Sequence, residues 1–130
     1  MSQLQPKKLD DEIGMVHSPE EQRLRDQGYK NHAFNVLVSH KLGYHRQIPD
    51  TRNPLCAERR PPEPEMLPSA SVVICFYNED LHTLLRSVHS VLDRSPSHLL
   101  RQIILVDDNS NLGNCTKFFF RNKTKIFTYT

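Results

Sequence analysis

Two clusters of polar residues each follow an apolar stretch of this 130-residue chain, and both hold groups that could bind a ligand. Asp107 and Asp108 come directly after the second stretch, and Tyr77 comes directly after the first. A carboxylate suits a nucleotide base or ribose, because two donors can approach its two oxygens. Tyr77 could add an aromatic face or a hydroxyl, although an aromatic side chain here is often simply packing. Asp and Asn after a strand also commonly cap turns, so the acidic pair has a structural interpretation too.

The apolar stretches predict two strands that would position these clusters. Ser71–Phe76 is a continuous, mostly β-branched run, which is typical of a strand covered on both faces. Gln102–Val106 predicts a second buried strand. Ligands bind outside the carboxyl ends of strands in parallel α/β sheets. If the two strands are parallel neighbours, both polar clusters lie at the same edge of the sheet.

The segment between the strands predicts an amphipathic helix. Its apolar residues recur at three- and four-residue spacing, without a miss: Leu81, Leu84, Leu85, Val88, Val91 and Leu92. Asn78 is the expected N-cap, followed by the acidic Glu79 and Asp80 at the positive end of the helix. Ser95-Pro96-Ser97 is expected to end it. Strand, helix and strand with short connections make a βαβ unit of the α/β class, with parallel strands.

The first half of the chain has a different character. Residues 1–17 are expected to be a disordered leader, and Ser18-Pro19-Glu20-Glu21 is a helix start signal. A second helical piece is expected over residues 31–42, with Gly43 as its stop. From residue 44 to residue 69, six prolines forbid a helix interior and predict an extended wrapping arm.

Composition excludes several functional classes. The net charge is only +2, with 17 basic residues scattered among 15 acidic ones, so no nucleic-acid footprint is present. No apolar run approaches the ~20 residues of a membrane span, and the first 15 residues do not resemble a signal peptide. The sequence as written therefore predicts a cytosolic chain. Its three cysteines, Cys56, Cys75 and Cys115, follow no metal-binding spacing.

Several segments in a fixed order resemble the polypeptide N-acetylgalactosaminyltransferase family, within it most of all the type-11 branch. The matching segments, which run from about Arg25 to Ser110, are Gly28-Tyr-Lys-Asn-His-Ala-Phe-Asn35, Leu42-Gly-Tyr-His-Arg46, Ile48-Pro-Asp-Thr-Arg52 with Cys56 following, Ser71-Val-Val-Ile-Cys-Phe-Tyr-Asn-Glu79, the helix with Leu-Leu-Arg-Ser-Val-His-Ser-Val, and Ile103-Ile-Leu-Val-Asp-Asp108.

The resemblance implies the opening part of a glycosyltransferase 2-like GT-A (Rossmann-like) domain. In this family UDP-GalNAc donates its sugar to Ser or Thr of a polypeptide acceptor, with Mn²⁺ neutralising the diphosphate. The expected organisation is a disordered leader (1–17), a helical stem and Pro-rich wrapping arm (18–69), the start of the GT-A domain (70–110) and a divergent tail (111–130). The family resides in the Golgi, behind a membrane anchor that this sequence does not show.

Carried over residue by residue, the resemblance assigns four nucleotide-binding positions. Cys75 and Tyr77 stand where the family contacts uridine, although the family often has Thr and His there. Asp108 stands at the uracil-recognising aspartate, and Asp107 supports it. Cys56 matches a cysteine that forms a disulfide with a partner outside this chain.

The resemblance stops after Ser110. The family's arginine-bearing segment, its Asp-x-His metal motif and its later metal histidine have no counterpart here, so no catalytic or metal-binding residue is assigned. Asp80-Leu81-His82 fits Asp-x-His formally, but residues two apart on a helix point to different faces. The expected function is a truncated transferase with only the uridine half-site, inactive alone. The alternative is a non-catalytic interaction or regulatory fragment of the parent enzyme.

Two strands and one helix are a poor core by themselves. The tail's Phe118-Phe119-Phe120 and Ile126-Phe127 are therefore expected to cover part of the exposed apolar surface, as a short helix or strand.

Overall fold

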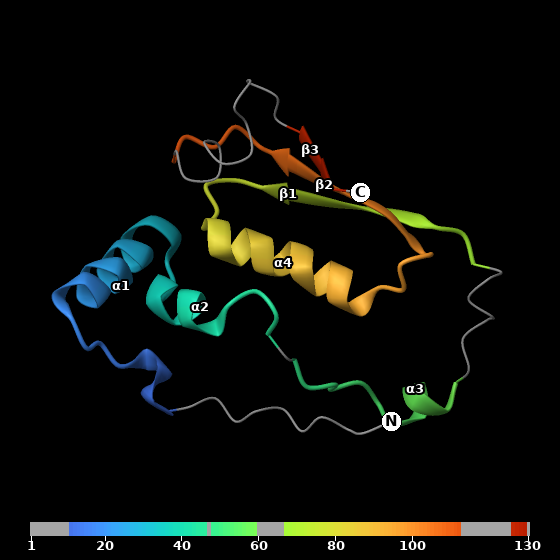
Figure 1. Ribbon diagram of the computed structural model, residues 1–130, viewed down its shortest axis with the longest axis horizontal. Coiled ribbons are helices and arrows are strands. Elements are labelled where there is room, and N and C mark those ends of the chain that lie inside the picture. Colours follow the sequence, from blue (N-terminus) through green and yellow to red (C-terminus); the bar gives the residue numbers. More distant parts are fainter. Residues whose placement is uncertain (1–10, 47, 60–66, 113–125, 130) are drawn as a thin grey trace.

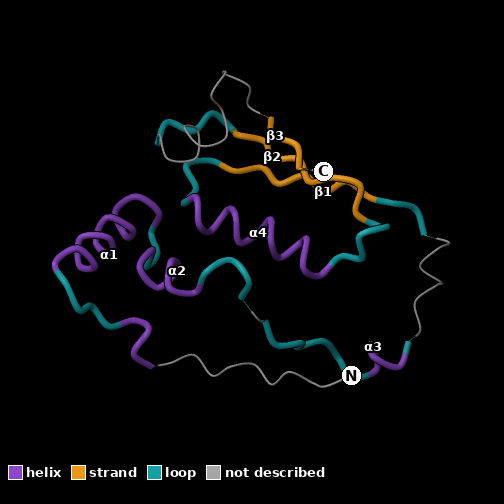
Figure 2. Tube along the Cα trace, viewed as in Figure 1, coloured by secondary structure: helices purple, strands orange, loops and turns teal. Residues whose placement is uncertain are grey.

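A computed structural model describes residues 11–46, 48–59, 67–112 and 126–129. The elements follow in the order η1 (Asp11–Gly14), α1 (Pro19–His32), α2 (Val36–Leu42), α3 (Leu55–Glu58), β1 (Ala70–Phe76), α4 (Leu81–Arg94), β2 (Leu100–Asp107) and β3 (Ile126–Tyr129). The strands form one layer, α4 lies along one side of it, and α2 lies on the side of α4 away from the strands (Figures 1 and 2).

The sheet has the order β1-β2-β3. β1 and β2 are parallel, with Val72 opposite Ile103 and Phe76 opposite Asp107, and α4 connects them. The predicted α/β class and the parallel βαβ unit are therefore confirmed. β3 pairs antiparallel with the other edge of β2. The part of the tail that was expected to cover apolar surface thus provides a strand, whereas residues 118–120 lie outside the described residues.

The core lies between the sheet and α4. Its buried side chains come from all three elements of the βαβ unit: Phe76, Leu84, Val88, Ile103 and Leu105. The expectation that β1 is covered on both faces is wrong for the described residues, since Val73 on the opposite face is 56% exposed. A continuous apolar run makes a strand suitable for burial on both faces, but it does not supply the second covering layer.

α4 begins two residues later than the sequence predicts. The expected N-cap, Asn78, instead has a positive φ of 48° and lies outside the helix. Asp80 is the N-cap, because its Oδ1 accepts hydrogen bonds from the backbone N–H (3.1 Å) and the hydroxyl (3.2 Å) of Thr83. Both residue types are good caps, so the local sequence does not choose between them. The helix ends at Arg94, just before the predicted Ser-Pro-Ser stop.

The stem consists of two helices that meet closely at Gly28. α1 begins where predicted, with the Ser18 side chain accepting the Glu21 N–H at 3.2 Å, and it continues through Gly28. The second helix was expected from residue 31 but begins at Val36. A Cβ on Gly28 would lie 2.7 Å from the Cβ of Val36, so glycine is required for this approach. Gly43 ends α2 as predicted, with a φ of 67°.

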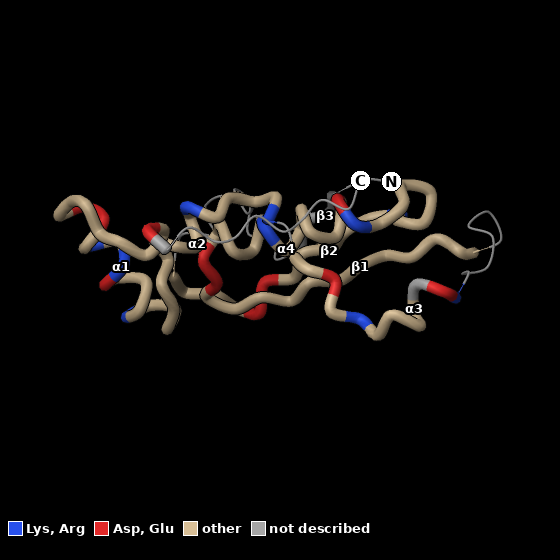
Figure 3. Tube along the Cα trace, turned by 90° about the horizontal axis from the view of Figure 1, so that it is seen from below, with Lys and Arg blue, Asp and Glu red and all other residues tan. Residues whose placement is uncertain are grey.

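Two shorter elements lie in segments that were expected to be irregular. η1 falls within the expected leader, and α3 makes one turn within the expected Pro-rich arm. Basic and acidic residues are interspersed along the trace (Figure 3), as their order in the sequence indicates. Among the described residues, no helix is both long enough and apolar enough to cross a membrane.

Candidate nucleotide-binding site

Tyr77 and Asp108 lie at the carboxyl ends of the two parallel strands. Phe76 and Asp107 form the last registered pair of β1 and β2, and both side chains are buried on the α4 face. The Asp108 N–H donates to the Phe76 carbonyl at 2.9 Å, which continues the pairing by one residue. Strand side chains alternate between faces, so Tyr77 and Asp108 belong to the opposite face. Both are exposed, Tyr77 by 57%.

Asn78 fastens the two loops of this edge to each other. Its Oδ1 accepts the N–H groups of Asn111 (2.8 Å) and Leu112 (2.9 Å), more than 30 residues along the chain. Its own N–H donates to the Ser110 hydroxyl at 2.8 Å. Asn tolerates the left-handed backbone conformation that this arrangement requires. The loops on either side of Tyr77 and Asp108 are therefore held in a fixed relation.

Asp107 stabilises the turn that follows β2 at this edge. It is 5% exposed, and its Oδ1 accepts the Ser110 N–H at 2.9 Å. This is the turn-capping geometry that the sequence left open for the acidic pair. Asp107 therefore shapes the loop that carries Asp108, while the exposed carboxylate at the edge is that of Asp108. Ser110 itself is engaged by both Asp107 and Asn78.

The two described cysteines are both exposed thiols without a disulfide partner among the described residues. Cys75 lies on the same face of β1 as Tyr77, opposite Val106 of β2, so it adjoins the edge. Cys56 lies in α3, and the disulfide assigned to it by resemblance stays a prediction. Cys115 lies outside the described residues.

Two histidines of the stem contact the segment between β1 and α4 at this edge. His32, the last residue of α1, has its Nδ1 3.0 Å from the carbonyl of Asn78. A carbonyl only accepts, so Nδ1 carries the hydrogen in this contact. His40 Nε2 of α2 lies 3.4 Å from Asp80 Oδ2 at the start of α4. The edge is thus bounded by the stem as well as by the sheet.

The described residues offer no built metal site. No group of three or more His, Cys, Asp or Glu side chains among them is arranged to hold a metal ion. Asp80 and His82, which formally fit Asp-x-His, are engaged separately: Asp80 caps α4, and the ring of His82 lies 3.8 Å from that of His40. The described part of the chain therefore does not by itself provide a set of ligands for Mn²⁺.

Sequence reasoning placed Tyr77 and Asp108 at this edge but missed what holds it together. Asn78 was expected to cap a helix, and Ser110 was given no part. A usable signal did exist, since asparagine is one of the few residue types other than glycine that often adopt a positive φ. The partners of Asn78, however, lie in the second loop, and no local pattern identifies them.

Comparison with known proteins gives consistent matches. Residues 71–126 match the domain described as glycosyl transferase family 2, a match that extends beyond residue 110. Polypeptide N-acetylgalactosaminyltransferase 11 of Xenopus tropicalis is 56% identical over 110 residues, which cover 84% of this chain and 18% of that protein. The inactive polypeptide N-acetylgalactosaminyltransferase-like protein 5 of Mus musculus is 49% identical over 106 residues, covering 77% of this chain and 24% of that protein.

A solved structure matches as well. The crystal structure of GalNAc-T7 with UDP, GalNAc and Mn²⁺ superposes with a TM-score of 0.61 at 36% identity, covering 75% of this chain and 18% of that one. The chain thus spans about a fifth of the length of the relatives that it matches. Over the stretch that these matches cover, the chain belongs to the polypeptide N-acetylgalactosaminyltransferase family, as its sequence motifs indicate.

Proposed function

We propose that this chain provides the uridine-binding half of a UDP-GalNAc-dependent polypeptide GalNAc-transferase. The observation that carries the proposal is the sheet edge, where Tyr77 and Asp108 are adjacent, exposed and held by the Asn78 bridge. A carboxylate at such an edge can accept hydrogen bonds from a base, and an aromatic ring beside it can pack against the base or ribose. The relative of known structure was solved with UDP, which supports the same ligand here.

Titration of the full chain with UDP, followed by backbone amide NMR, tests this proposal. We expect the shifts to concentrate at Tyr77 and Asp108, and Asp108→Asn to weaken UDP binding about tenfold, because a charge-assisted hydrogen bond becomes a neutral one. Asp26→Asn, on an exposed carboxylate of α1, is the matched control and should leave binding unchanged. Equal affinities for the wild-type chain and the Asp108→Asn variant would reject the proposed edge.

The proposal also holds that the chain does not transfer GalNAc by itself. The charge of a diphosphate leaving group needs neutralisation, which a metal ion with its ligands commonly supplies. Asp80 and His82 fit the family's metal motif only formally, because their side chains contact different groups. The sequence offers no other counterpart of that motif. Incubation with UDP-GalNAc, Mn²⁺ and a Thr-rich peptide should give no glycopeptide, and clear product would contradict this part.

A second candidate function is non-catalytic, as a partner or regulator of a full-length transferase. It is favoured by the similarity to the mouse protein, whose name describes it as inactive. In this case the chain should co-purify with a full-length transferase and change its activity. Absence of any complex at micromolar concentrations would argue against this second function. Only the proposed binding of UDP would then remain.

A further inference from the structure

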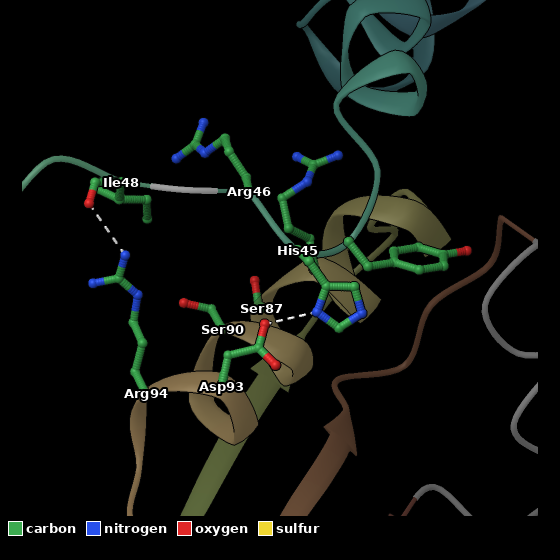
Figure 4. Close-up of a pocket in the computed structure, with 9 residues that line it drawn as sticks. His45, Arg46, Ile48, Ser87, Ser90, Asp93 and Arg94 are labelled. Atoms are coloured by element: carbon green, nitrogen blue, oxygen red, sulfur yellow. Dashed lines mark hydrogen bonds and ion pairs between the residues drawn. The ribbon is translucent and has the colours of Figure 1, made fainter. Parts of the chain in front are cut away.

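A hollow lies well away from the nucleotide edge, between the loop after α2 and the later turns of α4. Its volume is about 460 Å³, within the range of about 300–1,000 Å³ of typical small-ligand pockets. The residues that line it are Tyr44, His45, Arg46 and Ile48 of the loop, with Arg86, Ser87, Ser90, Asp93 and Arg94 of α4. Figure 4 shows these two groups facing each other across the hollow.

The lining is strongly basic. Three arginines stand against a single carboxylate, that of Asp93, whose Oδ2 lies 2.7 Å from Nδ1 of His45. Burial lowers the pKa of Arg86, and the positive charge of Arg46 lowers it further. Two like charges therefore act on each other here, and an anion between them would relieve that repulsion.

Several donors of the lining are still available. Arg46 is exposed and makes no hydrogen bond or ion pair with another described residue. Arg86 uses Nε and Nη2 on backbone and hydroxyl oxygens of the stem, and its Nη1 has no such contact among the described atoms. That nitrogen is reached by solvent, since no fully buried side-chain N or O of the described residues lacks a partner. Ser90 adds a hydroxyl that makes no hydrogen bond to another described residue.

We propose that this hollow binds the phosphate or sulfate group of a small anionic ligand. Guanidinium groups match the oxygens of a tetrahedral oxyanion in shape and charge, and a fixed guanidinium loses little freedom on binding. Arg86 is held by the stem, Arg94 is held by its bond to the carbonyl of Ile48 (3.3 Å), and Arg46 is free to close on the ligand.

The hollow is separate from the nucleotide edge. Ser90 lies about 14 Å along the helix axis from Leu81, because a helix rises about 1.5 Å per residue. Tyr77 and Asp108 lie beyond the N-terminal end of α4, whereas the lining begins at Arg86. A ligand in the hollow and a nucleotide at the edge can therefore be bound together, and the inference does not depend on the proposed function.

NMR titrations of the full chain with inorganic phosphate and with inorganic sulfate, at constant ionic strength against sodium chloride, test the proposal. We expect saturable shifts at residues 44–46 and 86–94 with both oxyanions and not with chloride. Shifts that chloride reproduces, or shifts that do not saturate, would overturn it.

Three variants complete the test. Arg46→Gln should weaken phosphate binding about fivefold, the effect of one charge at about 4 Å in a watery environment. Asp93→Asn should strengthen binding by a similar factor, because it removes the one negative charge of the lining. Arg101→Gln, an exposed arginine of β2, is the control of equal charge change. Equal weakening by Arg46→Gln and Arg101→Gln would show only a general charge effect and would refute the site.

Discussion

The two sides of α4 are held by different kinds of interaction. On the sheet side, Leu84 and Val88 are buried against Ile103 and Leu105 of β2. On the stem side, the contacts are polar: Arg86 donates to stem oxygens, and the Ser39 and Thr83 hydroxyls lie 3.0 Å apart.

This difference has an energetic consequence. Burial of apolar surface stabilises roughly in proportion to area and involves no titrating group. Hydrogen bonds of the stem side replace bonds to water and contribute a smaller net amount each. The sheet side should therefore determine whether the βαβ unit folds, and the stem side whether the stem remains attached.

The largest effect is expected from Leu105→Ala on the sheet side. Leu105 is 2% exposed, so its truncation leaves a cavity in the core and should lower the free energy of unfolding by about 2–5 kcal/mol. Urea denaturation followed by circular dichroism measures this loss. Val73→Ala, on the exposed face of β1, is the matched control and should cost under about 0.5 kcal/mol. Similar losses for both variants would mean that the two faces of the sheet do not differ as described.

A smaller and more local effect is expected from Arg86→Met, which keeps the aliphatic part of the side chain and removes the guanidinium group. The Nε of Arg86 donates to the Gly43 carbonyl at 2.8 Å, and its Nη2 donates to the carbonyl and hydroxyl of Ser39. Their loss should weaken attachment of α2 by about 1–3 kcal/mol. Amide hydrogen exchange should show lower protection in α2 and unchanged protection in β2.

Arg94→Met serves as the comparison for this variant, because Arg94 makes one bond of 3.3 Å to a backbone carbonyl at an exposed position. It should change the protection of α2 little. If Arg86→Met lowers protection in α2 and β2 to the same degree, the stem and the sheet unfold together and the proposed division between the two sides of α4 does not hold.

The same contrast explains what the sequence could predict. The sheet side of α4 follows from periodicity, since the apolar residues between Leu81 and Leu92 recur at helical spacing and locate the helix to within a few residues. The caps at Ser18 and Gly43 also follow from local chemistry. Each of these features depends on residues that are close together in the sequence.

The stem side and the bridge at the nucleotide edge could not be predicted in this way. The partners of Arg86 lie more than 40 residues away, and those of Asn78 more than 30. Nothing in the local sequence distinguishes Asn78 in a bridge from Asn78 as a helix cap, because the same side-chain oxygen serves both. Polar contacts between distant segments carry no periodicity.

The smallest effect concerns pH and the ring of His82 on the stem side of α4. Burial lowers the pKa of His82 below its ordinary 6.5, His40 and Arg86 lower it further, and Asp80 acts in the opposite direction. The unfolded chain therefore binds this proton at a higher pH than the folded chain does. The contribution is complete above pH 6.5 and is lost as the pH falls from 6.5 through the lowered folded-state pKa.

His82→Gln isolates this contribution. The free energy of unfolding of the wild-type chain, measured by urea denaturation in steps below pH 6.5, should fall more steeply than that of the variant. His98→Gln, at an exposed position after α4, should retain the wild-type slope. Because the ring of His82 contacts His40 at 3.8 Å and Tyr44 at 5.3 Å, both in the stem segment, the loss should appear first in the exchange of α2 amides. If His82→Gln keeps the full slope, protonation of other groups controls the pH response, and His82 does not make the polar side of α4 sensitive to pH.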